Sequence, residues 1–373
     1  MDLEVAQDAV RWLIENLHWK KEHKCISQQT SASVCYFGGE PTLLWDEIIE
    51  PLTKWAKQTY SDEISFNITT NGTLLDENRI RFLAEYNIIP LLSIDGAPKT
   101  QDFNRPCRNH LLQSSDLVMR NIPCLLHYFP NTTFRSTIAE ETVENTFENY
   151  IFAQYLGFKN IFMMPNGRDR WSEEKLKVLE DEFKRIYMYI ITCFQNNQMP
   201  PISFSSIDDS FSRIKKHNLA VLNHTSLPSS RNVNRCGLGT TMGSIGYNGN
   251  IYGCQEQDSQ GKDSYFYLGN IYQDGIDKTK HEQFLQKFYY SVRSCEETSF
   301  CDSCPLSLIC HDFNCPSTSY DLFQDFGKSN YVYCYWLRVM YEQAIITLQY
   351  LDTNPLFQQY LLNNCGYDFL RKE

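Results

Sequence analysis

Short apolar runs of extended pattern alternate along this chain with longer segments of helical spacing, and this alternation leaves few folds open. Five runs carry the extended pattern, at 33–37, 64–69, 91–94, 134–138 and 161–164. Helical spacing follows them, at 44–59, 76–86, 114–121, 143–156 and 172–195. Strands separated by helices predict an α/β fold with a parallel sheet, open or closed into a barrel. Residues 1–17 also have helical spacing, so we expect the chain to begin with a helix.

Polar or glycine-rich sequence accompanies each predicted strand. Because ligand sites in such folds lie at the carboxyl ends of the strands, we expect these side chains to converge on one rim. The candidate ligand-binding residues are Gly38, Gly39, Glu40, Pro41, Thr70, Asn71, Ser93, Asp95, Arg135 and Met164. An ordinary turn or a surface ion pair also accounts for any one of them taken alone.

Composition narrows the class of protein. The chain has 373 residues, 42 % of them apolar, which suffices for a large core and suggests more than one domain. Its net charge of −11 argues against a nucleic-acid partner. No run of about 18 apolar residues is present, so we expect no membrane span. The start, MDLEVAQDAV, has no secretion-signal pattern, and we expect a cytoplasmic protein.

The character of the chain changes at Cys236. Asn248-Gly249 between two apolar runs predicts a β-hairpin, and helical spacing returns at 335–350 and 354–362. No sixth strand–helix unit is evident after residue 195. We therefore expect an α/β part at 1–195, a bridging segment at 196–235, a cysteine-rich domain at 236–335 and C-terminal helices at 336–373.

Seven of the fourteen cysteines form a spaced series that is typical of metal binding. The series is Cys236, Cys254, Cys301, Cys304, Cys310, Cys315 and Cys334. Structural zinc takes four ligands per site, and seven cysteines complete two such sites only with a histidine, for which His311 is the nearby candidate. Iron–sulfur clusters take thiolates, and four plus three cysteines suit two [4Fe–4S] clusters. We favour iron–sulfur, and zinc remains the alternative.

Together these motifs resemble the radical SAM superfamily, in particular its members with a SPASM domain. Gly38-Gly39-Glu40-Pro41 is similar to the motif that holds the amino group of S-adenosylmethionine (AdoMet), and Asn67–Thr73 to the next strand. Ser93-Ile94-Asp95-Gly96 matches S-x-D-G, which borders the ribose. Arg135 and Met164 match positions that face the AdoMet carboxylate and the adenine. The resemblance implies a (β/α)6 TIM-like barrel followed by a Cys-rich SPASM domain.

The resemblance also assigns the cysteines to two auxiliary [4Fe–4S] clusters. By analogy, the outer cluster is held by Cys301, Cys304, Cys310 and Cys334. The inner cluster is held by Cys236, Cys254 and Cys315, and its open position favours an enzyme that crosslinks a peptide thiolate.

This chain departs from the family in three ways. It contains no C-x3-C-x2-C, the motif that ligates the AdoMet-cleaving cluster, and its five predicted strands lack the first of the family's six. The resemblance therefore implies a partial barrel, a missing N-terminus and an inactive chain as given. Four residues, where three are usual, separate Cys310 from Cys315. Gln255-Glu256 follows Cys254 where sulfatase maturases have a catalytic aspartate, for which Glu256 is a partial substitute, and Met242 replaces a further cysteine.

The function implied by this resemblance is radical modification of a peptide or protein side chain, for example by thioether formation. Its partners would be a peptide substrate and an electron donor such as flavodoxin or ferredoxin. One alternative is a non-catalytic iron–sulfur binding or electron-transfer protein. Others are a formylglycine-forming enzyme of the sulfatase-maturase type and a zinc-stabilised interaction module.

Overall fold

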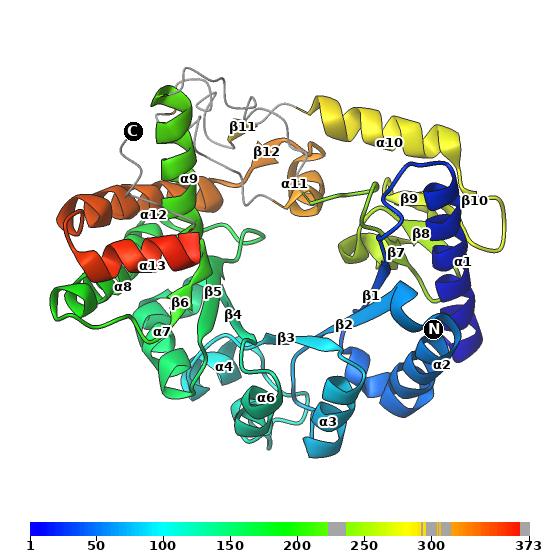
Figure 1. The fold of residues 1–373 in the computed structure, drawn as a ribbon, viewed down its shortest axis with the longest axis horizontal. Helices are drawn as coiled ribbons and strands as arrows, with labels where there is room; N and C mark the ends of the chain where they lie inside the picture. The colour runs from blue at the N-terminus through cyan, green and yellow to red at the C-terminus, as the bar shows by residue number, and fades with distance from the viewer. Residues whose placement is uncertain (223–235, 292–293, 296–303, 305, 307–314, 366–373) are drawn as a thin grey trace. The chain divides into compact units, whose positions relative to one another are not determined.

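Six parallel strands form the main sheet of the computed structural model, in the order in which they occur along the chain (Figure 1). They are β1 (Ala32–Tyr36), β2 (Ile64–Thr70), β3 (Ile89–Ser93), β4 (Thr133–Ile138), β5 (Asn160–Pro165) and β6 (Ser203–Phe204). Registers in β1–β2, β2–β3, β4–β5 and β5–β6 are all parallel. Just after β3, the backbone N–H of Ile94 donates to the carbonyl of Arg135 in β4 at 3.0 Å. The predicted parallel α/β fold is confirmed.

The structure describes residues 1–222, 236–291, 294–295, 304, 306 and 315–365. The chain divides into two units that are each continuous in space but not in sequence. Unit 1 comprises Met1–Leu92 and Asn234–Ser291, and unit 2 comprises Ser93–Val233 and Val292–Glu373. The division into four segments expected from the sequence remains a prediction.

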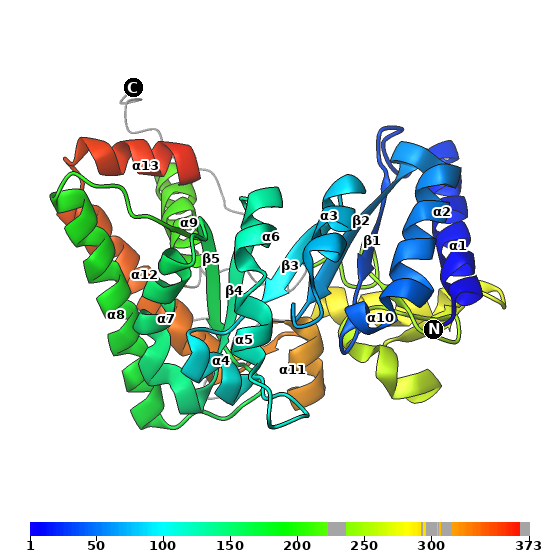
Figure 2. The same cartoon turned by 90° about the horizontal axis from the view of Figure 1, so that it is seen from below.

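Unit 1 packs helices against β1 and β2. Its helices are α1 (Leu3–Glu22), α2 (Glu50–Tyr60), α3 (Glu77–Glu85) and α10 (Lys278–Tyr290). Helix α1 begins at Asp2, whose carboxylate accepts from the N–H of Val5 at 2.9 Å and so caps the helix. Helix α1 buries Val10 and Ile14 and contacts α2 and β1, and Figure 2 shows it beside α2. The predicted N-terminal helix is confirmed.

A small antiparallel sheet completes unit 1. Its strand order is β10-β9-β8-β7, with β7 at Ser244–Ile245, β8 at Asn250–Tyr252, β9 at Tyr267–Asn270 and β10 at Gly275–Ile276. The predicted hairpin at Asn248-Gly249 joins β7 to β8, and Gly249 has φ +78°, which a glycine adopts at low cost. After β9, the hydroxyl of Tyr272 donates to the Asp8 carboxylate at 3.0 Å and ties the sheet to α1.

Unit 2 surrounds β4–β6 with helices (Figures 1 and 2). They are α4 (Pro98–Asn104), α5 (Ser114–Met119), α6 (Ile122–Tyr128), α7 (Thr146–Tyr155), α8 (Glu173–Gln195), α9 (Ser205–Leu222), α11 (Pro316–Phe323), α12 (Tyr331–Tyr350) and α13 (Pro355–Cys365). A parallel pair, β11 (Ser294–Cys295) and β12 (Lys328–Ser329), precedes α12. Helix α12 packs on α8 and α9, where the buried ring of Trp336 meets Phe183 with centroids 6.2 Å apart.

Two predictions about the α/β part are wrong. We expected five strands, and the sheet has a sixth, β6. We expected no further strand–helix unit in the bridging segment after residue 195, and the structure has β6 followed by the 18-residue helix α9. The cause is that β6 has only two residues, directly after Pro200-Pro201-Ile202, so no alternation marks it. The start of α9 is rich in serine and aspartate, which are weak helix formers.

No helix in the described part of the chain combines the length and apolar character that a membrane crossing requires.

Candidate functional site

Glu40 is the polar centre of the β1 rim in unit 1. It lies in extended conformation before a 3-10 turn, Pro41–Leu44. Its Oε1 accepts from the hydroxyls of Thr42 and Thr70, the second at 2.7 Å, and its Oε2 accepts from the N–H of Asn71 at 2.7 Å. The carboxylate therefore joins the loop after β1 to the end of β2. Among the described residues only the N–H of Asn71 donates to Oε2, so this oxygen keeps a lone pair for a further donor.

The two glycines before Glu40 leave space beside the backbone. Gly38 has φ +149°, a region that side chains other than hydrogen rarely allow. A Cβ built at Gly38 or Gly39 would meet no atom of the described residues within 4 Å. Close packing therefore does not account for the glycines at these two positions. The loop thus offers an open stretch of backbone next to a carboxylate.

Thr70 and Asn71 shape the end of β2. Thr70 is buried, and its hydroxyl oxygen accepts from the N–H of Gly72 at 3.0 Å. The Asn71 side-chain oxygen accepts from the N–H and hydroxyl of Thr73 at 2.9 and 2.7 Å, which forms an Asx turn. Both residues therefore stabilise the loop that presents Glu40.

In unit 2, Arg135 and Met164 lie on the same face of neighbouring strands. The register pairs Arg135 with Phe162 and Thr137 with Met164. The alternate residues of β4 and β5, including Phe134 and Met163, are buried on the opposite face. Arg135 is exposed, with its guanidinium carbon 5.9 Å from the centroid of the Phe162 ring. This face can receive an anion at Arg135 and an apolar group beside Met164.

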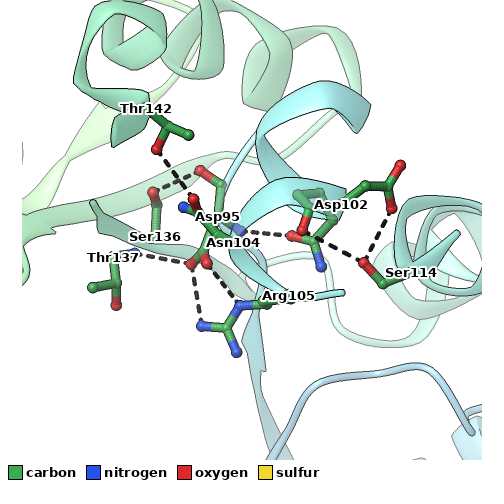
Figure 3. A network of polar contacts seen from close by, with 9 residues as sticks. Asp95, Asp102, Asn104, Arg105, Ser114, Ser136, Thr137 and Thr142 are labelled. Atoms are coloured by element: carbon green, nitrogen blue, oxygen red, sulfur yellow. Dashed lines mark hydrogen bonds and ion pairs between the residues drawn. The ribbon is translucent and has the colours of Figure 1, made fainter. Parts of the chain in front are cut away.

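Asp95 is buried just after β3, and the chain itself satisfies its carboxylate (Figure 3). Arg105 donates to it through Nε at 2.8 Å and through Nη2 at 3.1 Å, and the N–H of Thr137 donates at 3.0 Å. Its own N–H donates to the side-chain oxygen of Gln101 at 2.9 Å. Ser93, at the end of β3, is half-buried. Asp95 therefore holds the rim together, while Ser93 remains partly accessible.

The N-terminus of α12 is docked on the loop that follows β5. The side chain of Asn330 donates to the carbonyl of Gly167 at 2.8 Å and caps α12 by accepting from the N–H of Val332 at 2.9 Å. The ring of Tyr333 lies so close to Gly167 that a Cβ there would be 2.1 Å from it. Burial raises the pKa of Tyr333 to about 12, and the nearby Cys315 acts in the same direction. This contact places the cysteine-bearing end of α12 next to the β5 loop.

The candidate metal ligands are distributed over both units. Cys236 and the buried Cys254 belong to unit 1, where the N–H of Gly239 donates to the carbonyl of Gly253 at 3.1 Å and links the two cysteine-bearing segments. Cys304, Cys315 and Cys334 belong to unit 2. Cys301, Cys310 and His311 lie outside the described residues.

Within the described residues, no group of three or more Cys, His, Asp or Glu side chains is arranged to hold a metal ion. Two of the four thiols assigned to the outer cluster are not among those residues. Glu256, the candidate base, is exposed in the 3-10 segment Gln255–Asp263 that follows Cys254. The ligand sets and the role of Glu256 therefore remain predictions.

Sequence reasoning missed several residues that shape these rims. Arg105 and Gln101 hold Asp95, and the buried Asn149 accepts from the N–H of Ala97 at 2.9 Å. Tyr333 lies against Gly167. A partial signal existed for Arg105, because a buried rim aspartate requires a cationic partner and Arg105 is the first arginine after it.

Comparison with solved structures identifies the fold. The chain is similar to anSMEcpe with bound AdoMet and Cp18Cys peptide, with a TM-score of 0.66 and 20% identity, over 94% of this chain and 91% of that one. It is similar to Streptococcus suis SuiB bound to its precursor peptide SuiA, with a TM-score of 0.52 and 16% identity, over 88% of this chain and 68% of that one. At these identities the likeness establishes the fold alone.

Comparison with curated sequences gives shorter matches, and no protein-family model matches the chain. A cysteine-type anaerobic sulfatase-maturating enzyme of Clostridium perfringens is 39% identical over 75 residues, which is 20% of each protein. A protein of the same description from Clostridium novyi is 24% identical over 139 residues, or 37% of each. The matched region thus spans well under half of these relatives. The comparisons confirm the resemblance to radical SAM peptide maturases that the motifs indicate.

Proposed function

We propose that this chain is an AdoMet-binding protein of the radical SAM/SPASM type that acts on a peptide or protein side chain. The observation that supports this most is the Glu40 carboxylate, which is held by Thr70 and Asn71 beside open glycine backbone. The fold shared with anSMEcpe, whose structure contains AdoMet, supports the same ligand.

The proposed AdoMet contacts are those that the sequence resemblance implies. In unit 1, the free acceptor position of Glu40 takes a charge-assisted hydrogen bond from the amino group, and Gly38, Gly39 and Pro41 border it. In unit 2, Arg135 pairs with the carboxylate. Ser93 borders the ribose, and Met164 lies beside the adenine.

The proposed auxiliary clusters are [4Fe–4S] centres in a SPASM domain that follows a partial barrel. Cys301, Cys304, Cys310 and Cys334 would hold the outer cluster, and Cys236, Cys254 and Cys315 the inner one. The described thiols fit this chemistry in type, because thiolates are the ligands that such clusters take. When bound, the clusters supply electron transfer, for which a small donor such as flavodoxin or ferredoxin is the proposed partner.

The proposed substrate is a peptide, and the modification is a thioether or a related crosslink. Two solved relatives, anSMEcpe and SuiB, carry peptides. Because the 373 residues contain no C-x3-C-x2-C, we expect this polypeptide to bind AdoMet without cleaving it.

A second candidate function is formylglycine formation of the sulfatase-maturase type. It is favoured by both curated relatives, which are described as cysteine-type anaerobic sulfatase-maturating enzymes. In this reading the exposed Glu256 replaces the aspartate base expected after Cys254. The position of Glu256 one residue further along the chain disfavours this reading relative to crosslink formation.

Peptide binding tests the proposal and separates the two candidates. The anaerobically reconstituted chain is titrated with fluorescein-labelled Cp18Cys peptide and with a variant in which its cysteine is serine, each with and without AdoMet. We expect AdoMet to tighten the binding of a cysteine peptide. Tight binding of Cp18Cys supports the sulfatase-maturase type. If the chain binds AdoMet and an unrelated Cys-rich peptide but does not bind Cp18Cys, the result supports the crosslinking type. Failure to bind AdoMet and all of these peptides contradicts both, and a non-catalytic iron–sulfur role then replaces them.

A further inference from the structure

Every hydrogen-bonding group of Asp95 has a partner within unit 2. Besides the carboxylate and the N–H described above, its carbonyl accepts from the hydroxyl of Ser136 at 2.8 Å. The side chain of Asp95 is 5 % exposed and that of Arg105 is 32 % exposed. A buried carboxylate that is already paired with the guanidinium of Arg105 is poorly placed to bind a cationic ligand group. Asp95 therefore supports the groups around it.

Arg105 is held in place by the end of α4. It follows the last residue of this helix, and its N–H donates to the carbonyl of Gln101 at 2.9 Å. Gln101 also accepts from the N–H of Asp95 through its side chain. Two residues therefore hold Asp95. Gln101 in α4 accepts from its N–H, and Arg105, directly after α4, donates two hydrogen bonds to its carboxylate, as Figure 3 shows for Arg105. A bidentate guanidinium–carboxylate pair fixes orientation as well as charge.

The segment that Arg105 holds is hydrogen-bonded to β4 at Arg135 and just after it. Ile94 donates to the carbonyl of Arg135 at 3.0 Å, and the Asp95 carboxylate accepts from the N–H of Thr137 at 3.0 Å. One bond is made at the carbonyl of Arg135 itself and the other at the N–H two residues later, so together they fix the strand directly after Arg135. Arg105 neutralises the carboxylate that makes the second bond. Loss of Arg105 would leave a buried, unpaired charge at this point, and the backbone that carries Arg135 would shift.

We propose that Arg105 is a positioning residue, which acts through Asp95 to set the orientation of Arg135 toward the carboxylate of AdoMet. This inference rests on the proposed function, because it requires AdoMet as the ligand. It assigns Asp95 to support of the rim and leaves the anion contact to Arg135.

The test compares two ligands that differ in the group Arg135 would bind. AdoMet carries the amino-acid carboxylate, and 5′-methylthioadenosine lacks it. Calorimetric titration is made with the wild-type chain and with Arg105→Gln, Arg105→Lys and Arg135→Gln. Arg120→Gln, at an exposed position after α5, is the matched control. Thermal unfolding is recorded for every variant.

We expect Arg105→Gln to weaken AdoMet binding about tenfold, as Arg135→Gln does, and to leave 5′-methylthioadenosine binding within about twofold. Arg105→Lys should recover part of the affinity because it keeps the charge but not the fork. The double variant Arg105→Gln/Arg135→Gln should lose little more AdoMet affinity than Arg135→Gln alone.

Equal weakening of both ligands by Arg105→Gln would show a general structural role and overturn the inference. An unchanged AdoMet affinity in Arg105→Gln, with a loss in Arg135→Gln, also overturns it. If Arg105→Gln does not fold, the affinities of Arg105→Lys for AdoMet and 5′-methylthioadenosine are compared in the same way. A wild-type chain that binds neither ligand contradicts the proposed function and not this inference alone.

Discussion

The two rim carboxylates differ in what they leave available. Glu40 accepts from the neutral donors of Thr42, Thr70 and Asn71, whereas Asp95 is paired with the guanidinium of Arg105. A cationic ligand group would therefore find an acceptor at Glu40 and a neutralised carboxylate at Asp95. The sequence motifs implied an AdoMet contact for both, at the amino group for Glu40 and at the ribose for Asp95, and only the hydrogen bonds show that Asp95 is paired with Arg105.

The buried carboxylate of Asp208 in α9 makes stability depend on pH. Burial raises its pKa above the ordinary value of 3.8, while hydrogen bonds from Ser203 and Tyr360 oppose the shift. The folded chain then holds the proton more tightly than the unfolded chain. The stabilising contribution is therefore complete below the unfolded pKa and is lost as pH rises through the folded one.

We expect the stability of the wild type relative to Asp208→Asn to fall as pH rises from about 4 toward neutral, by about 1.4 kcal/mol for each unit of pKa shift. Urea unfolding across this range measures the difference. Asp116→Asn, at an exposed position in α5, is the control and should show no such trend. A difference that rises with pH would contradict the assignment.

At the scale of elements, the junction of α12 with the β5 loop depends on the absence of a side chain at Gly167. The Tyr333 ring is buried and occupies the space that a Cβ would need. Because Asn330 also bonds to this loop, the helix has two anchors there. The cysteine-bearing start of α12 is therefore fixed relative to β5.

We predict that Gly167→Ala lowers the free energy of unfolding by about 1–3 kcal/mol through overpacking against Tyr333. Gly39→Ala is the matched control, because its Cβ meets nothing within 4 Å, and it should change stability by less than about 0.5 kcal/mol. Denaturant unfolding measures both.

A second substitution checks that the clash causes the loss. In Gly167→Ala/Tyr333→Leu the smaller side chain should relieve it, so the effects of the two substitutions should not add. Equal stabilities of Gly167→Ala and Gly39→Ala would contradict the packing described here.

The sequence predicted those elements whose pattern extends over enough residues. Strand β2 alternates Ile64, Phe66 and Ile68 with polar residues, and the structure buries these three. Strand β6 has two residues and shows no period, so it was missed. The sequence predicted one helix at 114–121, and the structure has α5 there and a second helix, α6, directly after it. Helix α6 carries Pro123 in its first turn, where proline is tolerated. Arg105 was missed because its partner lies across a whole helix, at a distance that no local period reveals.

At the scale of the molecule, the cysteine series does not follow the division into units. Cys236 and Cys254 fold with the N-terminal part of the chain, and Cys315 and Cys334 fold with β4 and β5. Spacing along the sequence predicts metal binding by these cysteines but gives no information on their distribution in space. The assignment to clusters therefore needs a chemical measurement.

We predict about eight iron and eight sulfide ions per chain after anaerobic reconstitution. Cys254→Ser and Cys334→Ser should each remove about half of the iron, because each is assigned to a different cluster. Cys25→Ser, at an exposed position outside the series, is the control and should retain it. Tightly bound zinc without sulfide would contradict the cluster assignment and support the zinc alternative.

Binding of AdoMet to the reconstituted chain, measured by calorimetric titration, tests the central proposal most directly. Glu40→Gln replaces the acceptor that the amino group requires, and Glu47→Gln alters an exposed carboxylate seven positions away as the control. We predict saturable binding by the wild type and by Glu47→Gln, and a loss of about tenfold or more in Glu40→Gln, since a charge-assisted hydrogen bond contributes about 1.5–3 kcal/mol. No binding by the wild type, or equal binding by Glu40→Gln, would contradict it.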